Sequence, residues 1–483
     1  MIQIYDSLSG QKVEFKPRDV GRVAMYTCGP TVYNYIHIGN ARTFIWFDQI
    51  RRYLVYRGLH VTYVMNYTDV DDKIIERAAL EGVSEDEITH KYASAFERNM
   101  EGLGVKQPDI LCRATDHVEE MVAAIEELIE KGAAYASGGD VFFAVEKFPG
   151  YGKLSRRSLE EMRAGERVEP HAGKQHPLDF ALWKSAKEGE PSWPSPWGPG
   201  RPGWHIECSV MSTKYLGMSF DIHGGAADLK FPHHENEIAQ AEALAGDEPF
   251  VRHWLHAGLV QMDAEKMSKS LGNVVLANDL LEAYPGEALR YWAISGTYRS
   301  QAAFTESAVR DAVQGYERWR QFLDSARHAL EDEMPEPGAH VRPLDDAIPE
   351  SAGGAYIERF LRAMDDDFNS SEALAVVHDL VREANKFVEG AQRGDETARA
   401  SLVELTKAFL ELTDALGFRF PEEEVSSRLT GELVELLLEL REEARAEKAF
   451  ARSDKIRDRL TAVGVMVEDT PAGPRWRRGA AAD

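Results

Sequence analysis

The chain has 483 residues, 43% of them hydrophobic, and carries 81 acidic against 56 lysine and arginine side chains. This length exceeds one hydrophobic core and predicts about two to four domains. The net charge of −25 argues against a basic coat for nucleic acid, although a local basic face can still bind RNA.

Two further properties concern the compartment. No run approaches the roughly 18 apolar residues of a membrane span, and the first residues have no signal-peptide form. Three cysteines are too few for a disulfide framework and favour a reducing environment. We therefore expect a cytoplasmic protein without a membrane partner.

The first elements predict an α/β fold. Apolar residues 23–27 are typical of a buried strand, and residues 61–65 of a second. Between them, the apolar spacing after Asn40 predicts a helix that ends near Gly58. A strand, a glycine-containing turn, a helix and a strand open a parallel nucleotide-binding sheet.

The turn itself contains His37-Ile-Gly39-Asn40. Backbone N–H groups at a helix entry suit a phosphate, the imidazole adds a donor, and the glycine lets a flat base approach the backbone. Taken alone, this turn fits a plain tight helix entry equally well.

A second motif lies far downstream, at Lys266-Met-Ser-Lys269-Ser270. Two ammonium groups on a loop can neutralise a pyrophosphate leaving group, whereas most such loops are only solvated. Together with the His-Ile-Gly turn, this string resembles the two signature sequences of class I aminoacyl-tRNA synthetases.

The metal-type residues are dispersed. Cys28 and Cys208 lack the spacing of a zinc finger, so spacing alone favours buried structural thiols. A helix expected to start after residue 232 places His233 and Glu237 on one face, four residues apart. Two thiolates, an imidazole and a carboxylate suit Zn²⁺. The neighbouring His234 fits a polar helix start.

Longer blocks narrow the resemblance to the cysteinyl-tRNA synthetase family. They run through most of residues 20–300: Cys28-Gly-Pro-Thr-Val-Tyr, Asn66-Tyr-Thr-Asp69-Val-Asp71-Asp72-Lys73, Gly203-Trp-His-Ile-Glu-Cys208-Ser, Asp221-Ile-His223-Gly-Gly225 and Phe231-Pro-His-His-Glu-Asn-Glu237. The family implies activation of L-cysteine with ATP and Mg²⁺, transfer to cysteine tRNA, and one Zn²⁺ that binds the substrate thiolate.

The resemblance also assigns residues. It places zinc on Cys28, Cys208, His233 and Glu237, the substrate beside Gly29, Thr68 and Trp204, ATP at His37, Gly39, Asn40, His223, Gly224 and Lys269, and catalysis on His37, Asn40, Lys266 and Lys269. Thr68 and His223 could instead be plain polar residues at strand ends. Asn40 departs from the second histidine that many class I enzymes carry, although an amide can still donate to a phosphate.

Two points in this assignment stay open. Four protein ligands leave no free tetrahedral position, so the zinc must become five-coordinate or a ligand such as Glu237 must loosen. Asp69, Asp71 and Asp72 could suggest a Mg²⁺ site, but we favour a helix cap there.

The expected fold is a Rossmann-like parallel-sheet catalytic domain with an insertion, then a helical bundle and a small anticodon-binding C-terminal domain. The segments are residues 1–112 (first catalytic half), 113–200 (connective insertion, with a helix at 118–131 and strands near 140–145), 201–300 (second half with the signature loop), 301–345 (connecting helices and linker), 346–420 (bundle, with helices at 356–362, 372–389 and 398–416) and 421–483 (anticodon-binding region, with a charged helix pair at 432–460).

The last third of the chain distinguishes the synthetase from the alternative functions. The resemblance places anticodon contacts at Arg445, Asp454 and Asp469, and Trp476 offers a stacking face, although a solvated charged helix is the plain alternative. A cysteine ligase acting on an amino sugar would not need the region after about residue 344. A silent RNA-binding paralogue and a generic nucleotidyltransferase are the remaining alternatives.

Two smaller expectations complete the sequence analysis. Cys112 has no assigned role and is expected to be a packed thiol. No heptad pattern marks an oligomer interface, so a monomer is the default.

Overall fold

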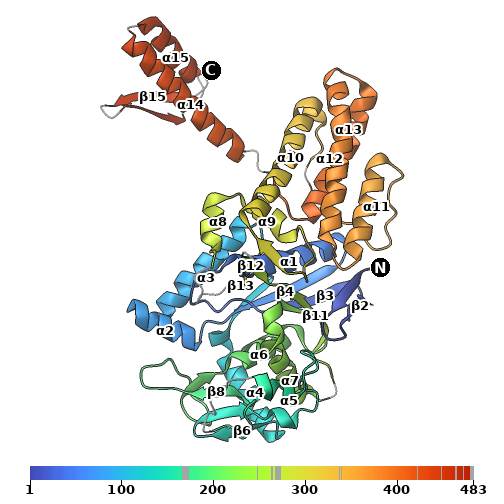
Figure 1. Ribbon diagram of the computed structural model, residues 1–483, viewed down its shortest axis with the longest axis vertical. Helices are drawn as coiled ribbons and strands as arrows, with labels where there is room; N and C mark the ends of the chain where they lie inside the picture. Colours follow the sequence, from blue (N-terminus) through green and yellow to red (C-terminus); the bar gives the residue numbers. More distant parts are fainter. Residues whose placement is uncertain are drawn as a thin grey trace. The chain divides into compact units, whose positions relative to one another are not determined.

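The computed structural model describes residues 1–165, 173–246, 248–262, 265–266, 274–336, 338, 340–420, 423–447, 449–462, 465–470 and 473–478. The chain forms two compact units, residues 1–419 and 420–483 (Figure 1).

A five-stranded parallel sheet is the centre of the first unit. Its strand order is β11-β10-β3-β4-β5, with β3 at Arg22–Thr27, β4 at His60–Tyr67, β5 at Ile110–Arg113, β10 at Phe220–Ala226 and β11 at Val251–Ala257. The two predicted strands and the helix between them, α1 (Ile38–Tyr56), are confirmed. The order reverses between β3 and β10, and open parallel sheets bind ligands at such a point, beyond the carboxyl ends of the strands.

The insertion between the two halves is an antiparallel sheet beside a helix. Strand order is β6-β7-β8-β9, with β6 at Ala134–Ser137, β7 at Asp140–Phe143, β8 at Phe180–Ser185 and β9 at Gly200–Pro202, next to α4 (Val118–Glu130). The helix expected at 118–131 is therefore confirmed, and the short strands expected near 140–145 are found as β6 and β7. Buried side chains of the insertion and the central sheet form one core, which includes Phe143, Trp183 and Trp254.

Further helices and short strands complete this part of the chain. The helices are α2 (Asp72–Glu81), α3 (Glu85–Gly102), α5 (Leu159–Gly165), α6 (Trp204–Leu216), α7 (His233–Ala245), α8 (Ala277–Ala283) and α9 (Gly286–Ile294). The strands are β1 (Gln3–Asp6), β2 (Gln11–Glu14), β12 (Val260–Met262), β13 (Glu265–Lys266) and β14 (Ala302–Phe304).

A four-helix bundle completes this unit, with α10 at Glu306–Leu330, α11 at Ala352–Asp365, α12 at Ser370–Gln392 and α13 at Glu396–Ala415. The three helices expected after residue 350 are confirmed. Each of them starts at a side-chain cap, supplied by Ser351, Asn369 and Asp395, because such side chains satisfy the first free N–H groups of a helix. Aromatic contacts such as Phe322–Phe409 fill the space between α10 and α13.

A buried ionic cluster joins α1 to the end of the bundle. Asp48 accepts from Arg52 Nε at 2.7 Å, from the backbone of Lys106 at 2.9 Å and from Arg290, whose guanidinium also donates to Leu416 O at 3.4 Å. Burial alone would raise the pKa of Asp48, but the charges of Arg290 and Arg52 outweigh it and lower the pKa below its ordinary value.

The second unit is a helix pair with a hairpin: α14 (Glu423–Ala446), α15 (Phe450–Ala462), β15 (Val465–Thr470) and β16 (Gly473–Arg478). The charged helix pair expected at 432–460 is thus confirmed. Its small core contains Val434, Leu438, Leu460 and Val465. Within the described ranges, no helix is long and apolar enough to cross a bilayer.

Replacing Asp48 tests the buried ionic cluster. We expect Asp48→Asn to lower the free energy of unfolding by about 3–5 kcal/mol, because Arg290 would keep a buried charge without its partner. The midpoint of urea denaturation measures this loss. Asp366→Asn removes an exposed pair with Lys12, 2.6 Å apart, and should cost less than about 1 kcal/mol.

The same comparison has a pH dependence. The folded-state pKa of Asp48 is depressed, so its stabilisation is present above about pH 4 and is lost as the pH falls through the folded-state pKa. The difference between wild type and Asp48→Asn should shrink on acidification. Equal stability of the two proteins at neutral pH would contradict the assignment.

Candidate active site and metal centre

The turn between β3 and α1 is held by a reciprocal cap. His37 Nδ1 accepts from the backbone N–H of Asn40 at 3.2 Å, while Asn40 Oδ1 accepts from the backbone N–H of His37 at 3.3 Å. The imidazole nitrogen that accepts carries no proton, so the proton lies on Nε2 and makes that atom a donor. Asn40 therefore fixes the tautomer and orientation of His37.

The chain on both sides of the second signature motif can be located. Backbone bonds join Ile38 N to Val275 O at 3.0 Å and Ala277 N to Ile36 O at 2.9 Å, so the residues after the motif lie against the His37 turn. At the start of the motif, the backbone of Lys266 pairs with Gln261 of β12. Lys269 and the side chain of Lys266 lie outside the described residues.

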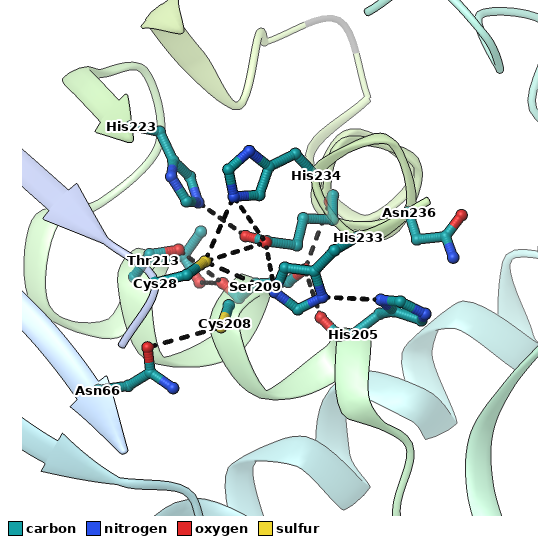
Figure 2. A network of polar contacts seen from close by, with 12 residues as sticks. Cys28, Asn66, His205, Cys208, Ser209, Thr213, His223, His233, His234 and Asn236 are labelled. Atoms are coloured by element: carbon teal, nitrogen blue, oxygen red, sulfur yellow. Dashed lines mark hydrogen bonds and ion pairs between the residues drawn. The ribbon is translucent and has the colours of Figure 1, made fainter. Parts of the chain in front are cut away.

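Four buried side chains from three elements converge beyond β3. Cys28 follows β3, Cys208 lies on α6, and His233 and Glu237 lie on α7, with one ligand atom of each within 4.8 Å of all the others (Figure 2). Cys28 Sγ lies 3.5 Å from His233 Nε2 and 3.4 Å from Glu237 Oε1. The fold thus brings together the four residues that the resemblance assigns to zinc.

A second set of donors overlaps the first. Cys28 and Glu237 also lie within 4.8 Å of His223 and His234. The imidazole of His234 is fully buried with Nε2 3.5 Å from Cys28 Sγ, so this residue is more than the polar helix start expected from its position. His223 Nε2 lies 2.7 Å from Glu237 Oε2, and its ring stacks on Trp254, which places this side chain beside the metal-type cluster.

Burial controls the charge of the cluster. It raises the pKa of the Cys28 thiol well above its ordinary value, and the neighbouring Cys208 and Glu237 raise it further. Burial also lowers the pKa of His233 and His234, so both imidazoles stay neutral. Neutral imidazoles and thiols that ionise on metal binding are soft or borderline ligands. They fit Zn²⁺ and do not fit Mg²⁺ or Ca²⁺.

Further histidines support the cluster from outside. His205 Nδ1 lies 2.9 Å from His233 Nδ1, and His256 Nε2 lies 2.9 Å from His234 Nδ1. Ser7 Oγ in turn lies 2.8 Å from His256 Nδ1. Such contacts fix the ring orientation of an imidazole ligand. Neither His205 nor His256 was predicted as a site residue, although His205 stands within the block that contains Cys208.

A cavity of about 170 Å³ opens beside the cluster. Its lining combines metal-type residues, substrate residues expected from the resemblance and the helix cap: Cys28, Cys208, His233, Gly29, Thr68, Trp204 and Asn40. The Trp204 ring stacks on the His233 ring with 4.3 Å between their centroids. Thr68 donates its hydroxyl hydrogen to Glu207 Oε2 at 2.8 Å.

Close backbone packing explains two glycines at this site. A Cβ on Gly29 would lie 1.7 Å from the carbonyl oxygen of Asn66, and a Cβ on Gly224 would lie 2.0 Å from the ring of Phe47. Asn66, the first residue of its block, lines the cavity, and no role was predicted for it from the sequence. Its Oδ1 accepts from Gly29 N at 2.9 Å and so shapes the cavity wall.

The three aspartates after β4 are engaged with the protein. Asp71 caps α2 by accepting from Lys73 N at 3.0 Å, as expected. Asp69 accepts from Thr115 Oγ1 at 2.7 Å, and Asp72 pairs with Lys184 at 2.6 Å.

Cys112 is a packed thiol, as expected, and it donates to Met65 O at 3.4 Å.

In the second unit, the residues expected at the anticodon have structural contacts of their own. Arg445 Nη1 lies 3.2 Å from Glu442 Oε1, and Asp454 pairs with Arg457 at 3.5 Å. Trp476 packs against the core of this unit and remains partly exposed. Asp469 lies in β15, and its side chain is outside the described part of the chain.

Comparison with known proteins agrees with this geometry. The family model "tRNA synthetases class I (C) catalytic domain" matches residues 14–314, the DALR domain matches 359–421, and the "Cysteinyl-tRNA ligase anticodon binding domain" matches 430–477. Methionyl-tRNA synthetase of Mycobacterium tuberculosis has the same fold, with a TM-score of 0.60 at 16% identity over 86% of this chain and 94% of that one. The fold and the site define a class I aminoacyl-tRNA synthetase.

Full-length relatives narrow the class. The chain is 47% identical to the cysteine–tRNA ligase of Desulforudis audaxviator, over 99% of this chain and 100% of the relative. It is 48% identical to the cysteine–tRNA ligase of Halalkalibacterium halodurans, over 99% of each chain. The chain belongs to the cysteine–tRNA ligase family.

Zinc content tests the metal centre without an activity assay. We expect the purified protein to hold about one zinc ion per chain and Cys208→Ser to hold much less, because a hydroxyl does not ionise as a thiol does. Cys112→Ser is the matched control, since this thiol is also buried but lies outside the cluster. Atomic spectroscopy after dialysis makes the measurement. Equal zinc in Cys208→Ser and wild type would contradict the assignment.

Proposed function

We propose that this protein activates L-cysteine with ATP and transfers the cysteinyl group to the 3′ end of cysteine tRNA. One observation carries the proposal: a buried cluster of two thiols, an imidazole and a carboxylate opens into a small cavity beside the His37 turn. A cavity of about 170 Å³ suits an amino acid, and the cluster supplies ligands that distinguish a thiol from other small side chains.

The first step is an in-line substitution at phosphorus. The cysteine carboxylate attacks the α-phosphorus of ATP, which enters with Mg²⁺, and pyrophosphate leaves. No side-chain nucleophile is required, since positioning and electrostatic stabilisation suffice. The Nε2–H of His37, oriented by Asn40, donates to the phosphates, and Lys266 and Lys269 neutralise the charge that develops on pyrophosphate. Gly39, His223 and Gly224 complete the ATP site that we assign by family resemblance.

Selection of cysteine rests on the metal-type residues. Cys28, Cys208, His233 and Glu237 would hold zinc, and when bound, zinc favours the substrate thiolate over the hydroxyl of serine. Trp204 closes the cavity against His233, while Thr68 and Gly29 line its wall toward the amino acid. Serine and cysteine are near-isosteres, and shape alone discriminates between them by only a few kcal/mol. Coordination of the substrate thiolate therefore has to supply the remaining discrimination against serine.

The second step takes place on the tRNA. A hydroxyl of its terminal ribose attacks the carbonyl carbon of the adenylate, an ester forms, and AMP leaves. We assign residues 421–483 to anticodon recognition, with Arg445, Asp454 and Asp469 as polar contacts and the exposed part of Trp476 as a stacking surface. The charged groups of this region can meet base edges, but its core packing limits how far Trp476 can turn.

We further propose the six-segment organisation given by the sequence, with a monomeric protein acting in the cytoplasm. The match of one family model to residues 14–314 supports treating both catalytic halves and the insertion as one functional unit.

Discrimination against serine tests the role of the metal centre. We expect kcat/KM for serine-dependent pyrophosphate exchange to lie at least ~10⁴-fold below that for cysteine, because a coordinating site rejects an analogue that it cannot ligate. Serine freed of cysteine is required, since traces of the correct substrate would hide the difference. Comparable rates for the two amino acids would remove zinc as the selector.

Truncation after Arg419 tests the role of the second unit. The shortened protein should retain cysteine-dependent pyrophosphate exchange, whereas aminoacylation of cysteine tRNA transcript should fall by about 100-fold, equivalent to about 2.7 kcal/mol of tRNA binding free energy. Both reactions are measured for the two proteins side by side. Unchanged charging would exclude a tRNA role for residues 420–483. If the intact protein exchanged pyrophosphate but charged no tRNA, a cysteine ligase acting on an amino sugar would replace the proposal.

A further inference from the structure

Glu207 is a fully buried carboxylate beside the amino-acid cavity. It lies on α6, directly before the metal-type residue Cys208, and none of its surface is exposed. Its Oε2 accepts the hydroxyl hydrogen of Thr68 at 2.8 Å, and Thr68 lines the cavity. Among the residues that the structure describes, no donor reaches the other carboxylate oxygen, Oε1. One oxygen of Glu207 is therefore buried without a hydrogen bond.

The charges around Glu207 do not neutralise it. Asp69 and Asp71 are close enough to repel its negative charge, whereas Arg201 attracts it. The guanidinium of Arg201 already pairs with Asp72, and no ion pair in the described part of the chain includes Glu207. A buried carboxylate without a cationic partner costs free energy. A cation that enters the cavity would supply this partner.

The backbone holds Thr68 in one position. Its N–H donates to Pro30 O at 3.2 Å, and its carbonyl accepts from Val32 N at 3.1 Å, so Thr68 is fixed to the turn that follows Cys28. The hydroxyl gives its single hydrogen to Glu207, which leaves only lone pairs for another partner. Toward the cavity, Thr68 Oγ1 can therefore accept a hydrogen bond but cannot donate one.

An acceptor with a buried carboxylate behind it favours a cationic donor. The ammonium of L-cysteine is its only group that combines hydrogens to donate with a positive charge. The carboxylate of the amino acid would be repelled by Glu207 and would find no donor on Thr68. The substrate thiol belongs at the other end of the cavity, which Cys28 and Cys208 line.

We propose that Glu207 is the counter-charge for the α-ammonium of the amino acid and acts through Thr68. The ammonium donates to Thr68 Oγ1, Thr68 donates to Glu207 Oε2, and the buried negative charge stabilises the ammonium across the hydroxyl. Glu207 is thus a positioning residue that determines which way round the amino acid enters the cavity. This inference rests on the proposed activation of an amino acid and adds to it the group that recognises the amino end.

Asp228 is the competing carboxylate, because it also lines the cavity. Its side chain is exposed, so water and salt screen its charge. The charge of Glu207 acts in a site without solvent, where an electrostatic interaction is stronger. The buried residue is therefore the better counter-charge for a bound ammonium.

The test distinguishes the two ends of the amino acid with two small thiols. Cysteamine has a thiol and an ammonium but no carboxylate, whereas 3-mercaptopropionate has a thiol and a carboxylate but no ammonium. Titration calorimetry measures the affinity of each for the full-length, zinc-loaded protein, as wild type and as Glu207→Gln. Glutamine keeps the size of the side chain and an acceptor for Thr68, but it removes the negative charge.

We expect Glu207→Gln to bind cysteamine about tenfold more weakly, because the ammonium loses its counter-charge. It should bind 3-mercaptopropionate at least as tightly as wild type does. The KM for cysteine in pyrophosphate exchange should rise by a similar factor, while the KM for ATP and the zinc content stay unchanged. Glu411→Gln is the matched control, since this carboxylate is 2% exposed, bonds to Tyr56 at 2.7 Å and lies outside the cavity. The control should bind both thiols as wild type does.

Three results would overturn the proposal. Equal weakening of both thiols in Glu207→Gln would show a distorted cavity, and unaltered cysteamine binding would show that the charge has no role. Weaker cysteamine binding in Asp228→Asn, with none in Glu207→Gln, would assign the ammonium to the exposed carboxylate. The proposed function fails separately: wild type would then bind both thiols but show no cysteine-dependent pyrophosphate exchange.

Thr68→Val is a second variant that leaves Glu207 in place. It removes the hydroxyl between ligand and carboxylate, so cysteamine binding should weaken, and Thr68→Ser should restore it. The double variant Thr68→Val/Glu207→Gln should bind cysteamine no more weakly than Thr68→Val, because both changes break the same connection. Additive losses would mean that Glu207 acts independently of Thr68 and would overturn the proposed connection.

Discussion

The site depends on the parallel pairing of β3 with β10. This pairing sets Thr27 opposite Gly224, and the backbone N–H of Cys28 donates to Gly224 O at 3.2 Å. The end of β3, which precedes the insertion in the sequence, is therefore fixed against β10, which follows it. Helices α6 and α7 pack against each other beside this point and deliver Cys208, His233 and Glu237. A shift of β10 by one residue against β3 would turn the side chains of β10 to the opposite face of the sheet.

This arrangement buries several ionisable side chains close together, which costs free energy if they are charged. Ligand residues that are buried together cannot remain charged without a partner. Burial raises the pKa of the Cys28 thiol and lowers the pKa of the His233 imidazole, so both groups stay neutral. Cys28, Cys208, His233 and Glu237 could hold a divalent cation, which would replace the protons of the two thiols and supply a counter-charge to the carboxylate. The cluster would therefore prefer a borderline cation such as Zn²⁺ to a hard cation such as Mg²⁺, because hard cations bind neutral imidazole and sulfur weakly.

The sequence predicted most of what is local. Strand β3, helix α1, the Asp71 cap and the i, i+4 pair of His233 and Glu237 depend on neighbouring residues, and all of them are found. The contacts that support the cluster could not be predicted from the sequence, because they join strands and helices that only the fold brings together. Motif resemblance supplied Cys28 and Cys208, whereas His256, which lies on β11 and reaches His234, has no motif of its own in the sequence analysis. The same limit applies to Asp48 and Arg290, whose pairing spans 242 positions.

Asn40 stands where many class I enzymes carry a histidine, and its contacts explain how the turn keeps its structure with a different residue. The position has two duties in this fold: its backbone N–H orients the imidazole of His37, and its side chain accepts the N–H of His37 in return. The first duty belongs to the backbone and does not depend on residue type. The second needs a short acceptor at the third helical position, which an amide supplies. His37 therefore keeps a fixed tautomer with Nε2–H as donor, and the asparagine retains an amide N–H₂ group that a phosphate can use.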